Sequence, residues 1–380
     1  SIGECRMTKA AELAKMGDIL ENGQLSGRRN LFYNGNFQCW QRSTSETGLG
    51  ASSGYFTADR WKTDIGATSA GRFTMNRTAG DPDGFNYGLV INCTTTDTSI
   101  AAGEFLLVQQ RFEGQDLQHL KKGTSGAETT VLSFYAKVVG SATDIVVEVF
   151  DNDNSRHICK KFTLTTEFQR YFFTIPGDTT GSLDQDNAQS MTVSFCLHSG
   201  STYTGGTLAT DWAANNNSNR FVGVDSIFAS TSNEFYLAGV QWEIGSQATP
   251  FEHRSFGEEL ALCQRYFQQF AGENGSGSAY TSLCVGHSSS ATRAFFYKQL
   301  QGEMRAAPTL TLSGTTGLRV ANMVSGANGT SSLAFGNTEM GTNGGYFRLD
   351  HNSISATTGD GCRLDRSNDT SAGVSAESEL

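Results

Sequence analysis

Proline is nearly absent from this sequence, and charged residues are sparse. The 380 residues include 4 prolines, and Asp, Glu, Lys and Arg together make up only 17% of the chain. The 28 basic residues are outnumbered by 38 acidic ones, which gives a net charge of −10 at pH 7. Nucleic-acid recognition needs clustered Lys and Arg side chains that contact phosphates. The composition therefore argues against a nucleic-acid partner.

Long apolar runs and closely spaced cysteines are missing as well. No run is long enough for a transmembrane helix, and the first residues lack the apolar core of a secretory signal. The eight cysteines are far apart, which excludes C-x-x-C zinc and redox motifs. We expect buried or isolated surface thiols rather than a disulfide framework. The protein is expected to be made in a reducing cytoplasm, without membrane insertion.

Glycine and phenylalanine are abundant, with 43 and 25 residues. Leu132, Phe134 and Ala136 alternate with polar residues, and similar alternation recurs along the chain at 89–93, 106–112, 145–149, 171–175 and 191–197. A period of two, interrupted by glycine-rich turns, is typical of antiparallel sheets. The sequence therefore predicts a mainly β protein with an antiparallel β-sandwich over residues 30–254.

A long strand is predicted near the end of this sandwich, from residue 234 onward. Val240 and Trp242 share one face, whereas Leu237 upstream lies in the opposite phase. A β-bulge at Ala238-Gly239 would reconcile the two phases, because glycine tolerates the backbone conformation that a bulge requires.

A linking helix is predicted over residues 255–271, with a capping box formed by Ser255 and Glu258. Five apolar residues follow a 4-3-4-3 spacing and form one stripe: Phe256, Leu260, Cys263, Phe267 and Phe270. Such a stripe fits a helix that lies on a sandwich, and it equally fits a trimer axis. We favour an oligomeric contact, because neighbouring residues enlarge the apolar surface.

Residues 272–380 are predicted to form a smaller C-terminal β-domain. Short strand candidates, separated by Gly, Asn, Ser and Thr turns, lie at 282–285, 293–297, 309–312, 318–320, 332–335 and 346–349. The polar fraction is high for so small a domain. A core this thin often relies on identical neighbours to complete it.

Six segments carry a resemblance to a known family. They are GRRNLFYNGNFQCWQRS (27–43), ADRW (58–61), LSFYAK (132–137), GVQWEIG (239–245), TPFEHRS (249–255) and EELALCQRYF (258–267). Together they resemble bacteriophage virion proteins of tail fibres and particle surfaces, over residues 7–270. The resemblance implies a virion structural protein whose sandwich is a jelly roll like that of carbohydrate-binding modules.

The resemblance also implies a role and partners. The chain would be a tail-fibre or appendage subunit that is made in the host cytoplasm, resides in the virion and binds host surface polysaccharide during adsorption. It would form a homotrimer, whose identical weak sites act together, and contact a tail adaptor or nozzle, or the capsid. The alternative is a capsid decoration or cement protein on the phage head. A polysaccharide-degrading enzyme is the less expected function.

Residues 1–29 are expected to be a helical anchor segment. A short helix is predicted over residues 7–22, with Leu13, Met16 and Leu20 in one apolar stripe. The basic pair Arg28-Arg29 follows it. An isolated helix of this length is marginal in water, so it must pack on something. Its partner is either its own sandwich or a neighbouring virion protein.

A polar, glycine-rich insertion over residues 199–220 is the candidate glycan site. Tyr203 and Trp212 are its aromatic residues, and Asp211 precedes the tryptophan. Sugar sites combine a ring that stacks on the apolar face of a pyranose with polar groups that bind hydroxyls. The alternative, which we favour for Trp212, is that the ring folds back onto the sandwich.

Asp151 and Asp153 resemble the start of a calcium loop. The later positions of an EF-hand are absent, so a structural calcium ion at a sandwich edge is one alternative and a plain hairpin turn is the other. No other cofactor is expected. Glycoside hydrolysis requires two carboxyl groups that face each other across a cleft, and the close carboxylate pairs of this sequence do not supply that geometry. We therefore expect no catalytic residues and no enzyme activity.

Overall fold

The computed structural model describes residues 28–67, 69–270, 280–326, 328–329, 333–352, 354–367 and 372–380. The fold is mainly β, as predicted. The chain divides into two compact units, of which the first ends at Arg254 and the second comprises Ser255–Glu379. The anchor helix predicted over residues 7–22 lies outside the described residues.

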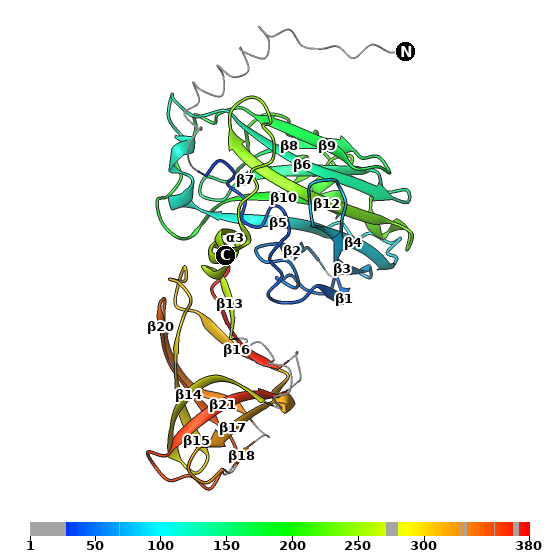
Figure 1. Cartoon of the computed structure of the whole chain (residues 1–380). Coiled ribbons are helices and arrows are strands. Elements are labelled where there is room, and N and C mark those ends of the chain that lie inside the picture. The colour runs from blue at the N-terminus through cyan, green and yellow to red at the C-terminus, as the bar shows by residue number, and fades with distance from the viewer. Residues whose placement is uncertain are drawn as a thin grey trace. The chain divides into compact units, whose positions relative to one another are not determined.

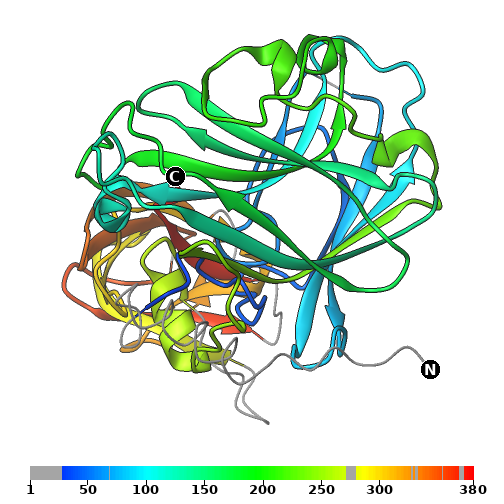
Figure 2. The ribbon, with the colours of Figure 1, turned by 90° about the horizontal axis from the view of Figure 1, so that it is seen from above.

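The first unit is an antiparallel jelly-roll sandwich of two six-stranded sheets (Figures 1 and 2). Sheet A has the order β1 (Ser45–Leu49), β3 (Arg72–Ala79), β4 (Tyr87–Thr95), β12 (Glu234–Ile244), β6 (Thr130–Val139) and β9 (Gln169–Ile175). Sheet B has the order β11 (Ala213–Ala214), β8 (Arg156–Thr163), β7 (Asp144–Asp151), β10 (Gln189–Ser199), β5 (Phe105–Glu113) and β2 (Lys62–Ile65). The loops that connect the strands of the first unit contain α2 (Ser201–Thr204), η1 (Gly114–Asp116), η2 (Gln118–Leu120), η3 (Asn217–Asn219) and η4 (Ile227–Ala229).

The core of the first unit lies between the two sheets. Leu132, Phe134 and Ala136 of β6 point into it, and Val193 and Phe195 of β10 meet them from the other sheet. The rings of Phe134 and Phe195 contact edge to face, with centroids 5.0 Å apart. Each such side chain contributes about 1.5–3 kcal/mol on full burial. The alternation in the sequence therefore identified the inward face of these strands.

The bulge predicted at Ala238-Gly239 is confirmed. The pairing of β12 with β6 shifts its register between Ala238 and Gln241. Gly239 has a φ of +54°, and a Cβ at this position would lie 2.4 Å from the ring of Phe85. Glycine is thus required by both the conformation and the space. The shift lets Leu237 and Val240 face the same core although they are three residues apart.

The segments that carry the family resemblance interlock in the first unit. The side chain of Asn30 accepts from the backbone N–H of Trp242 at 3.0 Å and donates to the carbonyl of Val240 at 3.0 Å. The carboxylate of Glu252 accepts from the backbone N–H groups of Arg29 and Asn30, at 3.1 and 2.8 Å. The start of the sandwich is thereby hydrogen-bonded to its end.

Trp61 of the ADRW segment is fully buried beside this junction. Its ring stacks on Phe32 and Phe37, with centroids 5.4 and 4.9 Å away. Its indole N–H donates to the carbonyl of Asn34 at 3.1 Å. The residues of these motifs therefore help to build the core of the sandwich and hydrogen-bond its first segment to its last strand.

The helix predicted over residues 255–271 is wrong in its second half. The helix α3 (Phe256–Gln264) begins with the predicted capping box, but Phe267–Phe270 forms strand β13, which pairs with β22 (Gly373–Glu377). This ladder takes the backbone groups that a longer helix would have used. The aromatic side chains of Phe267 and Phe270 also favour a strand.

The stripe predicted as an oligomeric contact is consequently not one helical face. Phe256 on α3 is 57% exposed and Leu260 is half-buried, whereas Cys263 is fully buried. Phe267 and Phe270 belong to β13 and are buried. The 4-3-4-3 spacing is thus divided between a helix and a strand.

The second unit contains two antiparallel sheets. The smaller sheet has the order β13, β22 and β16 (Thr309–Ser313). The larger has the order β18 (Asn328–Gly329), β17 (Leu318–Asn322), β21 (Gly361–Ser367), β14 (Tyr280–Ser290), β15 (Arg293–Gln299), β20 (Gly344–Asp350) and β19 (Ala334–Gly341). A short turn, η5 (Thr315–Gly317), precedes β17. Phe296, Phe347 and Leu364 lie in the core of this unit.

The seven described cysteines are buried, and no disulfide joins two of them, which agrees with the expectation of buried thiols. No helix in the described part of the chain has the length and apolar character needed to cross a membrane.

Candidate functional site

The glycine-rich insertion packs on the outer face of sheet B. The ring of Tyr203 contacts Phe105 edge to face at 5.3 Å and lies 6.1 Å from Phe221. Trp212 packs against the core, and its indole N–H donates to the carbonyl of Pro176 at 2.8 Å. Both aromatic rings proposed for sugar stacking are therefore engaged in packing. Only Asp211, the third residue of that prediction, is exposed.

A buried ammonium group occupies the region where calcium was considered. The Nζ of Lys122 lies 2.5 Å from Oδ2 of Asp151 and 3.1 Å from Oδ2 of Asp178. The same group donates to the carbonyls of Thr180 and Gly181, both at 2.9 Å. Two carboxylates and two carbonyls thus surround the ammonium of Lys122, and the guanidinium of Arg156 also donates to Asp178, at 2.8 and 3.2 Å.

The two predicted calcium ligands are used separately. Asp151 is fully buried against Lys122, whereas Asp153 is exposed and accepts from the backbone N–H of Asp184 at 2.9 Å. A calcium ion held jointly by Asp151 and Asp153 does not fit this arrangement, because Lys122 already neutralises the buried carboxylate.

A buried polar cluster secures the insertion to sheet B. Arg220 donates to both carboxylate oxygens of Glu148, at 2.8 and 2.6 Å, and Nδ1 of His157 lies 3.0 Å from the same carboxylate. Burial raises the pKa of Glu148, but the Arg220 guanidinium outweighs it and holds the pKa below its ordinary value. Burial and the Glu148 charge raise the pKa of the nearby Cys159 thiol. A thiol of this kind is unreactive.

The same cluster is a poor metal site. Glu148, His157 and Cys159 bring their ligand atoms within 4.8 Å of one another. Both oxygens of the carboxylate are nevertheless held by the guanidinium of Arg220, and a second cation there would be repelled. The cluster is best explained as an ion pair that fixes the insertion.

The described part of the predicted anchor segment bonds within the first unit. The guanidinium of Arg28 lies over the ring of Tyr33, 4.2 Å from its centroid. Arg29 donates to the hydroxyl of Thr249 at 3.1 Å. The other predicted attachment residues lie outside the described residues: Leu13, Met16 and Leu20.

A polar hollow, here called the Tyr236 recess, lies on the outer face of sheet A. It is open and has a volume of about 400 Å³. Strands β1, β3, β4 and β12 and the residue before β1 supply its lining: Thr44, Ser45, Asn76, Arg77, Thr78, Val90 and Tyr236. None of the sequence predictions included it.

The lining of the Tyr236 recess follows from strand register. Ser45 pairs with Asn76, Asn76 with Val90, Val90 with Tyr236, and Tyr236 with Lys137. These five residues form one row across adjacent strands, in which neighbouring side chains are about 4.5–5.5 Å apart. A hydroxyl, an amide, an aromatic ring and an ammonium group are thereby presented side by side.

The carboxylate of Glu234 holds the phenol of Tyr236 in place. The phenol of Tyr236 donates to Oε2 of Glu234 at 2.6 Å, and the amide of Asn92 donates to Oε1 of the same carboxylate at 2.9 Å. The Oδ1 atom of Asn92 is buried and has no hydrogen-bond partner among the described residues. A buried acceptor without a partner costs about 1–3 kcal/mol.

The electrostatics keep Tyr236 uncharged. Burial, together with the hydrogen bond to Glu234, raises its pKa to about 12. The ammonium of Lys137 lies 4.8 Å from the ring centroids of both Tyr236 and Phe168, and it donates to Asp81 at 2.8 Å. The ring is thus a neutral, positioned surface with polar groups on both sides. This arrangement can bind a polyhydroxylated ligand.

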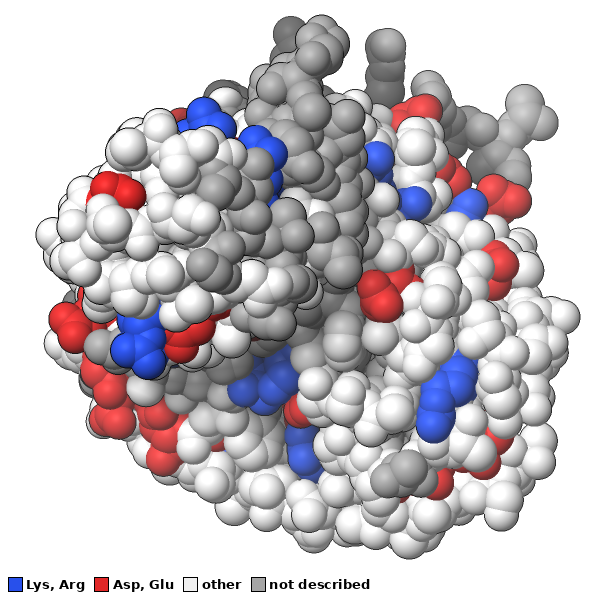
Figure 3. Space-filling view, turned by 90° about the horizontal axis from the view of Figure 1, so that it is seen from below, with Lys and Arg blue, Asp and Glu red and all other residues white. Residues whose placement is uncertain are grey.

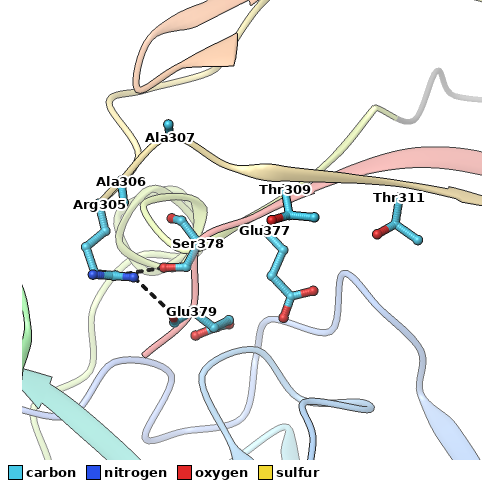
Figure 4. A pocket seen from close by; sticks show the side chains of 8 residues that line it. All are labelled: Arg305, Ala306, Ala307, Thr309, Thr311, Glu377, Ser378 and Glu379. Atoms are coloured by element: carbon cyan, nitrogen blue, oxygen red, sulfur yellow. Dashed lines mark hydrogen bonds between the residues drawn. The ribbon is translucent and has the colours of Figure 1, made fainter. Parts of the chain in front are cut away.

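A second hollow, of about 400 Å³, lies in the second unit (Figure 4). Thr309 and Thr311 from the edge strand β16 line it, together with Glu377. Arg305 donates to the carbonyls of Ser378 and Glu379, at 2.8 and 3.1 Å. None of the described residues that line this hollow is aromatic, so it lacks the stacking surface that the Tyr236 recess has.

Charged side chains of both signs are scattered over the face shown in Figure 3, with wide uncharged areas between them. No continuous basic patch appears among the described residues drawn there. This distribution agrees with the low charged fraction of the sequence.

No protein-family model matches the sequence, and no curated protein matches it. Among solved structures, the chain is similar to one titled "CBM4 structure and function", with 15% identity, a TM-score of 0.29, and coverage of 56% of this chain and 98% of that one. It is similar to TmCBM61 in complex with β-1,4-galactotriose at 7% identity and a TM-score of 0.29, covering 57% and 100%. It is also similar to the enzymatically active domain of bacteriophage CBA120 tailspike protein 4, at 11% identity and a TM-score of 0.28, covering 57% and 21%. Identities and TM-scores this low carry no conclusion about function.

Proposed function

We propose that this chain is a bacteriophage virion protein, a tail-fibre or appendage subunit that binds host surface glycan through the Tyr236 recess. The resemblance of its sequence segments to virion proteins supports the location. The polar and aromatic character of the recess supports the ligand class. Binding, without turnover, is the activity proposed.

The observation that carries the ligand class is the ring of Tyr236 in one recess with the hydroxyl of Ser45 and the amide of Asn76. A pyranose has an apolar face of C–H groups and a rim of hydroxyls. The ring would accept the apolar face, while the Ser45–Asn76 pair would bind hydroxyls. The hydroxyl of Ser45 donates to Oδ1 of Asn76 at 2.6 Å, and the register of β1 and β3 positions both side chains.

A shallow recess of this kind gives weak binding at a single site. Identical sites on a homotrimer would act together, because binding at one site raises the effective concentration at the others. The trimer is part of the proposal, and sedimentation of the purified chain measures it directly.

A glycan array probed with the full chain tests the recess. We expect binding to a subset of bacterial surface polysaccharides, and at least a tenfold loss in Tyr236→Ala, which corresponds to about 1.4 kcal/mol. Phe172→Ala is the matched control, because Phe172 is an exposed aromatic (58%) on β9 of the same sheet that does not line the recess. If Tyr236→Ala and Phe172→Ala bind alike, the recess is not the site.

The location is tested on the particle. A cryo-electron microscopy map of the virion should place the chain on the tail or an appendage; density on the head would favour a capsid decoration protein. Incubation of the chain with the bound polysaccharide should release no reducing ends. Release of reducing ends would contradict the proposal of binding without turnover.

A further inference from the structure

The row of residues that forms the Tyr236 recess continues beyond it. On the outer face of sheet A, Val90 pairs with Tyr236, and Tyr236 pairs with Lys137 of β6. Val90 and Tyr236 line the recess, whereas Lys137 does not. The ring of Tyr236 therefore has the recess on one side and Lys137 on the other. Because Val90 and Lys137 are two strands apart, this part of the row is about 10 Å long.

A second aromatic ring lies at this end of the row. The ammonium of Lys137 lies 4.8 Å from the ring centroid of Phe168, and equally far from that of Tyr236. The two rings meet edge to face, with centroids 6.3 Å apart. Phe168 belongs to the loop between β8 and β9 and is half-buried. Part of its surface is therefore open beside the row.

The loop that carries Phe168 is fixed to sheet A. The backbone N–H of Val138, the residue after Lys137 on β6, donates to the carbonyl of Thr165 at 3.0 Å. The hydroxyl of Thr165 donates to the carbonyl of Glu167 at 2.8 Å. A loop that is ordered beforehand loses little conformational freedom when a ligand binds.

Polar groups accompany the Phe168 ring. Lys137 donates to Oδ2 of Asp81 at 2.8 Å, and the two side chains are 20% and 52% exposed. A carboxylate offers about four acceptor positions, and an ammonium carries three N–H groups. A half-buried ring beside a partly exposed donor and an exposed acceptor repeats the combination found in the recess. We call Asp81, Lys137 and Phe168 the Phe168 subsite.

We infer that the Phe168 subsite binds a second sugar unit of the same glycan, so that the ligand is a chain of at least two linked units that runs across the strands past Tyr236. This inference rests on the function proposed for the recess. A single pyranose ring does not reach from Val90 to Lys137 across about 10 Å. A chain laid across the strands contacts the recess and the subsite together.

The alternative role of Lys137 and Phe168 is to brace the ring of Tyr236. The two roles differ in how affinity depends on the length of the glycan. A bracing residue affects every glycan that touches Tyr236, whereas a subsite affects only those that are long enough to reach it.

Soluble fragments of different length test the inference on the full chain. Fragments of one and four sugar units, prepared by partial acid hydrolysis of the tightest-binding array polysaccharide, are titrated by calorimetry. We expect affinity to rise about tenfold from the one-unit to the four-unit fragment. In Phe168→Ala, the one-unit fragment should bind as it does to the unchanged chain, and the four-unit fragment no more tightly. Phe172→Ala is the control, because this exposed phenylalanine (58%) on β9 belongs to neither the recess nor the subsite and should keep the full rise.

Three results would overturn the inference. The first is equal affinity of the unchanged chain for the two fragments. The second is a full rise with fragment length in Phe168→Ala, shown to be folded by circular dichroism. The third is an equal loss for both fragments in Phe168→Ala, which would make Phe168 a support for Tyr236 alone. Failure of the recess itself looks different: Tyr236→Ala would then bind both fragments as the unchanged chain does, and the inference would fail with it.

Discussion

At the scale of single residues, Lys122 joins several turns at one end of the sandwich. Its ammonium is surrounded by Asp151, Asp178 and the carbonyls of Thr180 and Gly181. Oxygen ligands of this kind are also those that calcium prefers. The segment considered for calcium thus contributes Asp151 to a salt bridge within the chain. The calcium prediction missed that a lysine, 29 residues earlier in the sequence, supplies the cation.

Replacing this lysine should destabilise the first unit. Lys122→Ala leaves the fully buried Asp151 without its counter-charge, so we expect a loss of about 3–5 kcal/mol in the free energy of unfolding. Lys121→Ala is the control, because that side chain is 58% exposed. Added Ca²⁺ should raise the melting temperature of Lys122→Ala and leave the unchanged chain unaffected. Equal melting temperatures of the two variants would contradict this role.

The Glu148–Arg220 ion pair predicts how stability depends on pH. The pKa of Glu148 is below its ordinary value of 4.5 in the folded chain. Its contribution is therefore complete above pH 4.5 and is lost as pH falls through the lower folded pKa. We expect urea unfolding at pH 7 and pH 3 to show that the free energy of unfolding changes less with pH in Glu148→Gln than in the unchanged chain. A steeper dependence in Glu148→Gln would count against the pair.

At the scale of elements, the bulge in β12 lets the residues on both sides of it face the same core. Gly239→Val would place a β-branched residue at a φ of +54°, against the rings of Phe85 and Tyr135. The backbone strain alone costs about 1–3 kcal/mol. The control is Gly126→Ala, whose Cβ would meet no atom closer than 3.8 Å. Thermal unfolding should separate the two variants, and similar melting temperatures would show that the bulge is dispensable.

Elements with regular alternation were predictable, whereas those set by distant pairing were not. In the strands around Leu132 and Val193, the alternation of apolar and polar residues predicts which side chains point into the core. Strand β13 does not, because its pairing with β22 depends on residues about a hundred positions away. Strand β21 contains Arg363 and Asp365 on its outer face, so its composition resembles a loop.

The candidate site shows the same limit. Tyr236 alternates with Phe235 and Leu237 and could be placed on the outer face from the sequence alone. Its neighbours Asn76 and Asn92 come from β3 and β4, and only the sheet order brings them together. The sequence predicted the glycan site in the insertion with Trp212, because a long polar loop is recognisable from sequence alone. Both aromatic rings of the insertion serve packing instead.

At the scale of the whole molecule, we propose a scaffold that acts through many identical copies. Deleting residues 1–29 should abolish incorporation into particles if that segment is the anchor, and the sandwich should still fold. Mass spectrometry of purified virions measures incorporation, and circular dichroism measures folding. Undiminished incorporation of the folded deletion variant would show that the chain attaches elsewhere.

The recess on sheet A is the central claim, and a crystal structure of the full chain with the tightest-binding glycan from the array tests it most directly. The account predicts a sugar ring against Tyr236, with its hydroxyls hydrogen-bonded to Ser45 and Asn76. A sugar bound instead at the insertion beside Asp211 and Trp212, with the Tyr236 recess vacant, would contradict it.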